Sequence, residues 1–349
     1  MKILYGVQGT GNGHISRSRE VIRYLKEGGH AVQVIVSGRD PALLWDMELF
    51  EPYTALRGLT FATHRGRIQH LRTARQLNLT RFYADIRAFD ARGYDLVITD
   101  YEPITARIAR RHRLPSIGIG HQYAFCHDIP VRGQNPLARY ILDHFAPVQH
   151  PIGLHWHHFG APILPPVVPE FAARPEPVQN KILVYLPFEG LADILGLLGR
   201  FDAHAFFIYH QLPQAEGVGH LNLRPYSRAG FLNDLADCSG VITNAGFELV
   251  SEALALGKKI LVKPLAGQME QLSNAAALTE LNLGLAMKRL DATAVERFLD
   301  QPDGVRVHYP NVAEMIADWI SKREWGSAAD LSRHAWSQTH TSSGFSSSP

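Results

Sequence analysis

The sequence has few cysteines, no long hydrophobic run and no concentrated patch of charge, and each shortage excludes a class of protein. Its two cysteines, Cys126 and Cys238, are too few for a disulfide framework or a four-ligand zinc site. No stretch reaches the roughly 18 uninterrupted apolar residues that a membrane-spanning helix needs. The first apolar run gives way after a few residues to glycines and polar residues, which is typical of a buried strand and not of a signal peptide. We therefore expect a cytoplasmic protein.

Charge is unevenly divided along a chain of ordinary composition. Of the 349 residues, 46% are hydrophobic and 19% are charged, and at about 150 residues per domain this length suggests two domains. Residues 1–160 carry 20 Lys and Arg against 13 Asp and Glu, whereas residues 161–349 carry 15 against 20, which gives net charges of +7 and −5. The basic half suits an anionic ligand or peripheral contact with an anionic membrane surface, unless the charges only cover solvated faces. Because the basic residues form no concentrated stripe, we expect no nucleic-acid partner.

Short apolar runs alternate with helical patterns, which predicts βαβ units and parallel sheets. In the first half, strands are expected at residues 3–7, 31–37, 59–63, 95–99 and 116–120, with helices at 16–27, 68–92 and 102–111. In the second half, strands are expected at 181–186, 205–209, 221–225, 240–243, 259–263 and 285–288, with helices at 190–198, 230–236, 247–256, 268–281 and 294–299. The pattern predicts an α/β fold with two Rossmann-like, doubly wound domains facing a cleft, where ligands bind at the carboxyl ends of strands.

Prolines and small polar residues mark the boundaries between segments. Six prolines in residues 161–180 cannot lie inside a helix or a central strand, so they predict a stiff linker between domains at residues 1–160 and 181–310. An amphipathic pattern predicts a helix at residues 312–322, within a segment that spans 311–325. Residues 326–349 end in SQTHTSSGFSSSP, and this tail is expected to be disordered because it has few apolar groups.

A glycine-rich turn follows the first expected strand and reads Gly9-Thr10-Gly11-Asn12-Gly13-His14. Its spacing matches neither the GxGxxG dinucleotide motif nor the P-loop, but its glycines allow a ligand to approach the start of a helix closely. His14, at the end of the turn, has the chemistry of a general base, and Asp100, at the end of the fourth strand, can orient it. The structural alternatives are a histidine that supports the turn and an aspartate that caps a helix.

The most informative segment of the second half is residues 243–275. A strand ends at Thr243, and the turn at Gly246 opens a helix whose free N–H groups suit a phosphate. Glu252, one turn further along, is suited to the vicinal hydroxyls of a ribose. The loop after the next strand presents three side chains suited to sugar hydroxyls, namely Gln268, Glu270 and Gln271.

This segment resembles the nucleotide-sugar donor signature of GT-B glycosyltransferases, in particular the group with the lipid-linked peptidoglycan GlcNAc transferase. The residues that carry the resemblance are Gly246, Glu252, Gly257, Pro264, Glu270, Gln271, Asn274 and Ala275. The turn at residues 9–14 is similar to that group's acceptor-side loop. The resemblance implies a GT-B fold whose helix near 312–322 crosses back to the first domain. It further implies an inverting hexosyltransferase, without cofactor or metal, that moves a sugar from a UDP-linked donor to a lipid-linked or cell-envelope glycan at the inner face of the membrane.

The resemblance also implies roles for single residues. It assigns Glu252 to the donor ribose, and the backbone of Gly246 and Phe247 to the diphosphate. It implies that Glu270 and Gln271, in the later loop, contact the transferred sugar. One departure is the loop at residues 186–190, Leu-Pro-Phe-Glu-Gly, because relatives often have a Gly-Gly-Ser type loop there and proline lacks an N–H donor.

Other functions share this architecture. A nucleotide-sugar hydrolase would use water in place of the acceptor, and a catalytically silent nucleotide-sugar-binding protein would need no base. An epimerase would need a further carboxylate on the donor side, for which Glu248 is the candidate.

Several remaining residues carry weaker hypotheses. His121 and Gln122 follow the fifth strand, so they are candidates for the acceptor side unless their role is structural. At residues 155–158, His-Trp-His-His, a solvated strand end is expected rather than a metal site. A metal site at Asp100 with Glu102 is likewise the less favoured interpretation. Eight arginines within residues 57–92 suit an anionic acceptor or lipid, unless they form the solvated face of a helix.

Overall fold

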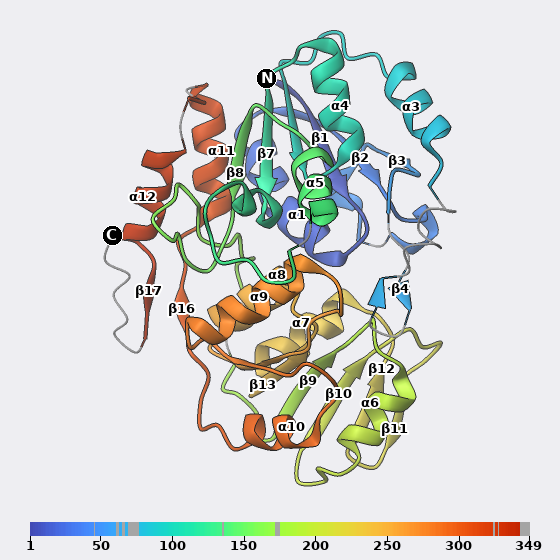
Figure 1. Ribbon diagram of the computed structural model, residues 1–349, viewed down its shortest axis with the longest axis vertical. Coiled ribbons are helices and arrows are strands. Elements are labelled where there is room, and N and C mark those ends of the chain that lie inside the picture. Colours follow the sequence, from blue (N-terminus) through green and yellow to red (C-terminus); the bar gives the residue numbers. More distant parts are fainter. Residues whose placement is uncertain are drawn as a thin grey trace.

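The computed structural model describes residues 1–44, 46–60, 63–64, 67–68, 77–134, 136–171, 175–323, 325–326 and 328–342. Two α/β domains lie one above the other, with the first half of the chain in the upper domain of Figure 1 and most of the second half in the lower one. The predicted fold class, two Rossmann-like domains, is therefore confirmed. Among the described helices, none is long and apolar enough to cross a membrane.

The first domain is built on a six-stranded sheet in the order β3-β2-β1-β6-β7-β8, and all its neighbouring strands are parallel. The strands are β1 (Lys2–Gln8), β2 (Ala31–Ser37), β3 (Tyr53–Leu56), β6 (Leu96–Asp100), β7 (Ser116–Gly120) and β8 (His150–Gly153). The helices and turns are α1 (Asn12–Glu27), η1 (Pro41–Leu43), η2 (Glu48–Phe50), α3 (Leu79–Ala88), α4 (Pro103–His112), η3 (His121–Cys126) and α5 (Pro136–His144), and β4 (Thr63–His64) pairs with β5 (Arg67–Ile68). The central strands are buried along their length, as their continuous apolar runs predict.

The second domain is built on a seven-stranded sheet in the order β11-β12-β10-β9-β13-β14-β15, which is parallel except for the edge strand β11. The strands are β9 (Lys181–Tyr185), β10 (Ala205–Tyr209), β11 (Glu216–Val218), β12 (Leu221–Arg224), β13 (Gly240–Thr243), β14 (Lys259–Val262) and β15 (Leu285–Ala286). The helices are α6 (Leu191–Leu198), α7 (Arg228–Asp237), α8 (Phe247–Ala255), α9 (Met269–Glu280) and α10 (Ala292–Leu299).

One hydrophobic cluster runs through both domains. It contains Ile3 and Ile98 of the first sheet together with Val250 and Leu254 of α8, all of them fully buried. At the junction, Trp156 donates its indole N–H to Ser251 Oγ at 2.8 Å. Because the two sheets share this core, the domains pack directly against each other.

The last described helices return to the first domain. The helix α11 (Val312–Lys322) packs on α1, with Asn311 donating to the Tyr24 hydroxyl and Ser321 lying 2.8 Å from His30. Figure 1 shows α11 and α12, in red, beside the upper domain.

The expectation of a disordered tail from residue 326 is wrong for the described part of that segment. The helix α12 (Ala329–Ser337) is anchored by Trp336, which is 9% exposed and donates to Ile163 O at 2.7 Å. After it, β17 (His340–Thr341) pairs with β16 (Val307–His308). Ser332 Oγ also donates to Ile163 O at 2.7 Å, and Ala335 is fully buried, so several contacts order a segment of polar composition. Residues 343–349 lie outside the described residues.

Two expectations in the first domain also need correction. The strand next to β2 is β3 (Tyr53–Leu56), which pairs with it in register, whereas the third strand was expected at residues 59–63, of which 61 and 62 lie outside the described residues. The helix expected at 68–92 is α3 alone, which begins after Asn78, whose side chain accepts from Arg81 N at 2.9 Å. The remainder of that expectation falls mostly on residues 69–76, outside the described residues, as do most of the arginines between residues 61 and 76. The pattern missed α5 and β8.

Candidate functional site

A cavity of about 720 Å³ lies between the two domains. Its walls include the loops that follow β1, β6 and β7 of the first sheet and β9 and β13 of the second. The carboxyl ends of both parallel sheets therefore open onto one space, which is where ligands bind in doubly wound folds. The volume falls in the range of roughly 300–1,000 Å³ that is typical of small-molecule sites.

His14 and Asp100 come together on the first-domain wall of this cavity. Because β1 and β6 are neighbours in the sheet, the loop after β1 lies beside the end of β6, and Val7 pairs with Asp100. His14 Nδ1 lies 2.7 Å from Asp100 Oδ1, and the His14 side chain is 16% exposed whereas Asp100 is fully buried. A carboxylate only accepts, so this contact fixes the tautomer in which Nε2 is left to accept a proton. The pair has the geometry of a general base and its orienting group.

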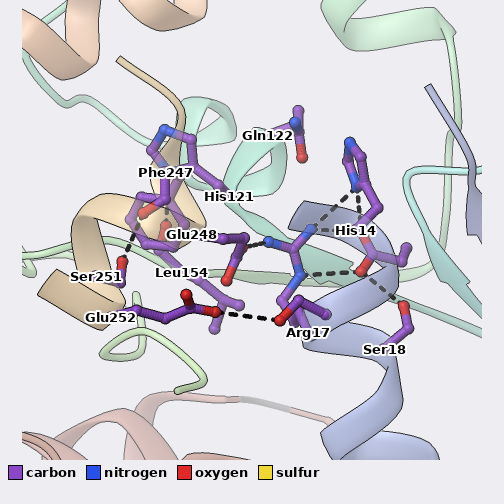
Figure 2. Close-up of polar contacts among 12 residues, drawn as sticks. His14, Arg17, Ser18, His121, Gln122, Leu154, Phe247, Glu248, Ser251 and Glu252 are labelled. Carbon is purple, nitrogen blue, oxygen red and sulfur yellow. Dashed lines mark hydrogen bonds and ion pairs between the residues drawn. The ribbon is translucent and has the colours of Figure 1, made fainter. Parts of the chain in front are cut away.

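Arg17 also holds Asp100, and Figure 2 shows the Arg17 side chain between Glu248 and His14. Its Nε donates to Asp100 Oδ2 at 2.9 Å, its Nη2 donates to Oδ1, and Ser18 Oγ donates to Oδ2 at 2.9 Å. Burial by itself would raise the pKa of Asp100, but the charges of Arg17 and His14 outweigh it and the pKa is lowered. Asp100 therefore stays ionised although it is buried.

The start of α1 also contacts the second domain. Arg17 Nη1 donates to Glu248 Oε1 of α8, and Ser16 Oγ donates to Glu252 Oε1 at 3.1 Å. At Gly13 a Cβ atom would lie 2.7 Å from Glu248 Cγ, so this position has no room for a side chain. The first turn of α1 thus lies directly against α8.

Glu252 is a buried carboxyl at the cavity wall. Burial raises its pKa from 4.5 to about 7, and Ser16 and Arg228 only partly oppose this rise. Arg228, at the start of α7, lines the same cavity.

The first turn of α8 meets the cavity with backbone groups. Its N-cap is Gly246, which has no side chain to satisfy the first N–H groups, and Phe247 and Glu248 follow it on the cavity wall. Phe247 is stacked on His121 with ring centroids 4.1 Å apart and an interplanar angle of 3°. The stacking holds the start of α8 in place beside the open N–H groups.

His121, an acceptor-side candidate, lies at the cavity wall but is fully buried and makes structural contacts. Its Nδ1 lies 2.8 Å from Leu154 O and its Nε2 2.6 Å from Asn274 Oδ1. A neutral imidazole has one N–H, so it donates to one of these oxygens at a time. Burial lowers the pKa of His121, and its contacts tie η3 to α8 and α9.

Gln122 and Glu270 meet across the cavity. Gln122 Nε2 donates to Glu270 Oε2 at 3.1 Å, and Gln268, two residues before Glu270, also lies on the cavity wall. Gln271, in contrast, uses its Oε1 to accept from Leu265 N at 2.7 Å, so this oxygen holds the preceding loop. Of the three polar residues expected here, Gln271 therefore has a clear structural contact.

The residues of the glycine-rich turn differ in the contacts that they make. Gly9 N donates to Ser37 O at 2.6 Å, and the Thr10 hydroxyl accepts from Gln8. Asn12 joins the domains, because its Oδ1 accepts from Arg39 at 2.7 Å and its Nδ2 donates to the Tyr185 hydroxyl at 3.3 Å. At Gly11, a Cβ atom would meet nothing within 4 Å.

Several residues of the cavity wall were not predicted from the sequence. Arg17 lies one helical turn after His14, and this i to i+3 spacing was a signal that could have found it. The others depend on the packing of the two domains and had no local signal: Arg19, Arg39, Tyr185, Tyr226 and Arg228.

The metal hypotheses receive no support from the residues around them. Glu102, not Asp100, caps a helix, since its carboxylate accepts from Ile104 N and Thr105 N at the start of α4. His155 is 2% exposed, which corrects the expectation of a solvated strand end. The described part of the chain holds no group of three metal-ligating side chains.

The loop at residues 186–190 is held by ion pairing. Glu189 accepts from Lys263 Nζ at 2.5 Å, and the Glu189 carbonyl lies 3.3 Å from His210 Nε2. Pro187 and Phe188 line the cavity.

Comparisons with known proteins agree with this architecture. Solved structures similar to the chain include SnogD from Streptomyces nogalater (16% identity, 96% of this chain and 98% of that chain, TM-score 0.53) and SsfS6 from Streptomyces sp. SF2575 with thymidine diphosphate (15%, 96% and 99%, 0.57). The spinosyn rhamnosyltransferase SpnG is similar at 14% identity, 96% and 99% coverage and a TM-score of 0.58. A search of curated proteins found no match. A family model described as glycosyl transferase family 1 matches residues 1–302, so the chain belongs to this glycosyltransferase family and has the GT-B fold.

Proposed function

We propose that the protein is an inverting, metal-independent glycosyltransferase in which His14 is the base. The observation that carries the proposal is the 2.7 Å contact between His14 Nδ1 and the buried Asp100, on a cavity wall opposite the start of α8. His14 Nε2 takes the proton of an acceptor hydroxyl, whose oxygen attacks the anomeric carbon while the bond from that carbon to the diphosphate breaks. One displacement of this kind inverts the anomeric centre. The imidazolium that forms is stabilised by Asp100.

The leaving diphosphate is proposed to lie at the start of α8. The N–H groups after Gly246 carry the partial positive charge of a helix N-terminus, and Arg39 and Arg228 line the same cavity. These groups can balance the charge that develops on the leaving oxygen without a metal ion. Activity in excess EDTA tests this point, and loss of turnover that Mg²⁺ restores would contradict it.

The donor is proposed to be a pyrimidine nucleoside diphosphate sugar, with UDP as the first nucleotide to test. An aromatic group on the cavity wall is formed by Tyr185, Tyr226 and Phe231. The ring centroid of Tyr185 lies 5.5 Å from that of Phe231 and 6.1 Å from that of Tyr226. Such rings can pack against a nucleobase. Glu252 is proposed to accept from the ribose hydroxyls. The comparison structure of SsfS6 contains thymidine diphosphate, which is also a pyrimidine nucleotide.

The acceptor is proposed to carry its hydroxyl on an apolar body. Tyr101, next to Asp100 in the chain, stacks on Phe145 at 5.2 Å and uses its hydroxyl to donate to Leu142 O. Its ring is therefore left as an apolar surface, and Ile141 beside it on the cavity wall is 49% exposed. This lining supports a lipid-linked acceptor of the kind expected from the sequence, reached by peripheral contact with a membrane.

Turnover of the His14→Ala variant tests the proposal. Donor sugars are offered in metal-free buffer with a polyprenyl-linked sugar or an apolar polycyclic alcohol as acceptor, and release of the nucleoside diphosphate is measured. We expect His14→Ala to lose about 10²–10⁴-fold in kcat, with nucleotide affinity changed by less than about twofold. Release that is equally fast without acceptor would instead support a hydrolase. Full turnover by His14→Ala would exclude His14 as the base.

A further inference from the structure

Unpaired oxygen atoms gather in the cavity. Among the described residues, eight buried side-chain nitrogen or oxygen atoms have no hydrogen-bond partner, and four of them belong to amide residues of the cavity wall: Gln8, Gln122, Asn244 and Gln268. In all four the unpaired atom is the carbonyl oxygen. A carbonyl oxygen only accepts, so each of these atoms calls for a donor that the described part of the protein does not supply.

The amide orientations are fixed by neighbours. Gln122 Nε2 donates to Glu270 Oε2 at 3.1 Å, and Asn244 Nδ2 donates to Lys263 O at 2.9 Å. Gln122 is 8% exposed and Asn244 is 4% exposed, so their free oxygens are removed from bulk water. A buried acceptor without a partner is unfavourable, and a ligand that donates to it removes that cost.

Gln122 lies beside the proposed reacting groups. A Cβ atom placed on Gly120 would be 3.3 Å from Gln122 Oε1, 3.3 Å from Arg17 Nη2 and 3.4 Å from Asp100 Oδ1. Figure 2 shows Gln122 on the same side of Arg17 as His14. Its amide thus spans the gap between the His14–Asp100 pair in one domain and Glu270 in the other, which is where a transferred sugar would meet the base.

The arginines near Gln122 already have hydrogen-bond partners. Arg17 directs its Nε and Nη2 to Asp100 and its Nη1 to Glu248. Arg39 donates to Asn12 on the other side of the glycine-rich turn. Two acceptors therefore lie at this position, namely the buried Gln122 oxygen, which has no donor, and the Glu270 carboxylate.

From these contacts we infer that the transferred group is a neutral sugar that donates its hydroxyls to Gln122 and Glu270, and that a uronic acid is rejected. The inference rests on the proposed function and makes it more specific. A hydroxyl can donate to an amide oxygen or a carboxylate, whereas the carboxylate of a uronic acid can only accept and would face the negative charge of Glu270. Gln122 is then a specificity-determining residue supplied by the acceptor domain.

Binding measurements on the full chain test the inference. Titration calorimetry with uridine, thymidine and guanosine diphosphates first identifies the nucleotide that binds. A hexose and its uronic acid on that same nucleotide are then compared, and we expect the hexose donor to bind at least about tenfold more tightly. The comparison needs no variant, so it stands even if a substitution fails to fold. Equal or tighter binding of the uronic acid would overturn the inference.

A variant isolates the contribution of Gln122. Gln122→Met keeps the length of the side chain but removes the acceptor, and we expect it to weaken binding of the hexose donor by about tenfold while binding of the nucleoside diphosphate alone is retained. Gln338→Met, on the exposed end of α12, is the matched control and should leave both affinities unchanged. Unchanged hexose affinity in Gln122→Met would overturn the inference alone. Failure of every nucleotide to bind the wild-type protein would overturn the proposed function, and the inference with it.

Discussion

Arg17 and Glu248 connect the two domains through one guanidinium group. Arg17 holds Asp100 with its Nε and Nη2, and with Nη1 it donates to Glu248 on the first turn of α8. Asp100 in turn holds His14. The orienting group of the proposed base is therefore linked by two side chains to the helix proposed to hold the leaving group.

Glu248→Gln should lower activity through Arg17. The Glu248 carboxylate accepts from Arg17 Nη1, so without its charge Asp100 is the one carboxylate partner that Arg17 keeps, and the link between α1 and α8 is weaker. We expect kcat/KM to fall by about tenfold, which initial rates at a fixed pH would reveal. Wild-type rates in the variant would show that Glu248 acts only in packing.

Asp100→Asn should lower both activity and stability. The substitution leaves Arg17 as a buried cation with one carboxylate partner and removes the group that fixes the His14 tautomer. We expect kcat to fall on the order of 10³-fold or more, and the free energy of unfolding to fall by about 3–5 kcal/mol. Steady-state kinetics and urea unfolding measure the two effects. A variant that unfolds like the wild type would show that the buried pair adds little to stability.

Glu252→Gln should raise stability at neutral pH but weaken nucleotide binding. The folded-state pKa of Glu252 is raised by burial to about 7, so the folded protein binds a proton that the unfolded chain releases near its ordinary pKa of 4.5. The free energy of unfolding of the wild type therefore falls as the pH rises through this window, by up to about 3 kcal/mol from this group. In the variant, position 252 cannot ionise, so the free energy of unfolding should not show this fall with pH. Unfolding measured at several pH values would test this. An unchanged affinity for nucleoside diphosphates would contradict the proposed ribose contact.

Gly13→Ala should disturb the contact between the domains more than the fold. The new Cβ would lie 2.7 Å from Glu248 Cγ, so α8 or the Glu248 side chain must move away from α1. Helices tolerate alanine better than glycine, so thermal unfolding should change little, whereas kcat/KM should fall by about tenfold or more. Gly196→Ala in α6 is the control, because its Cβ would meet nothing within 4 Å. Wild-type kinetics in Gly13→Ala would show that the close contact between Gly13 and Glu248 is not required for activity.

Trp336→Ala should loosen the end of the described chain. The indole of Trp336 is 9% exposed and donates to Ile163 O, so its removal costs buried area and a hydrogen bond together. We expect the free energy of unfolding to fall by about 3 kcal/mol. Hydrogen exchange should then be faster in α12 than in the neighbouring α11. Ser337→Ala, at an exposed position of the same helix, serves as the control.

Structural features could be predicted from the sequence where neighbouring residues in the chain determine them. The parallel strands followed from apolar runs, and the meeting of His14 with Asp100 followed from their positions after two strands that proved to be neighbours. The contacts of Arg17 with Glu248, and of Gln122 with Glu270, join residues more than 140 positions apart and depend on how the two domains pack. No local periodicity encodes such a contact. For the same reason, α12 was not predicted, since Ser332 and Trp336 anchor it to Ile163 O, far away in the chain.

The return of α11 to α1 has a consequence for synthesis on the ribosome. The ribosome makes α1 well before α11, which begins at Val312, so the surface of α1 that α11 covers stays open until both domains have been translated. The first domain can form its sheet early, but the nascent protein carries an uncovered helix face until α11 has been made. We therefore expect the ribosome-bound intermediates that lack α11 to be the species most exposed to aggregation or to capture by chaperones.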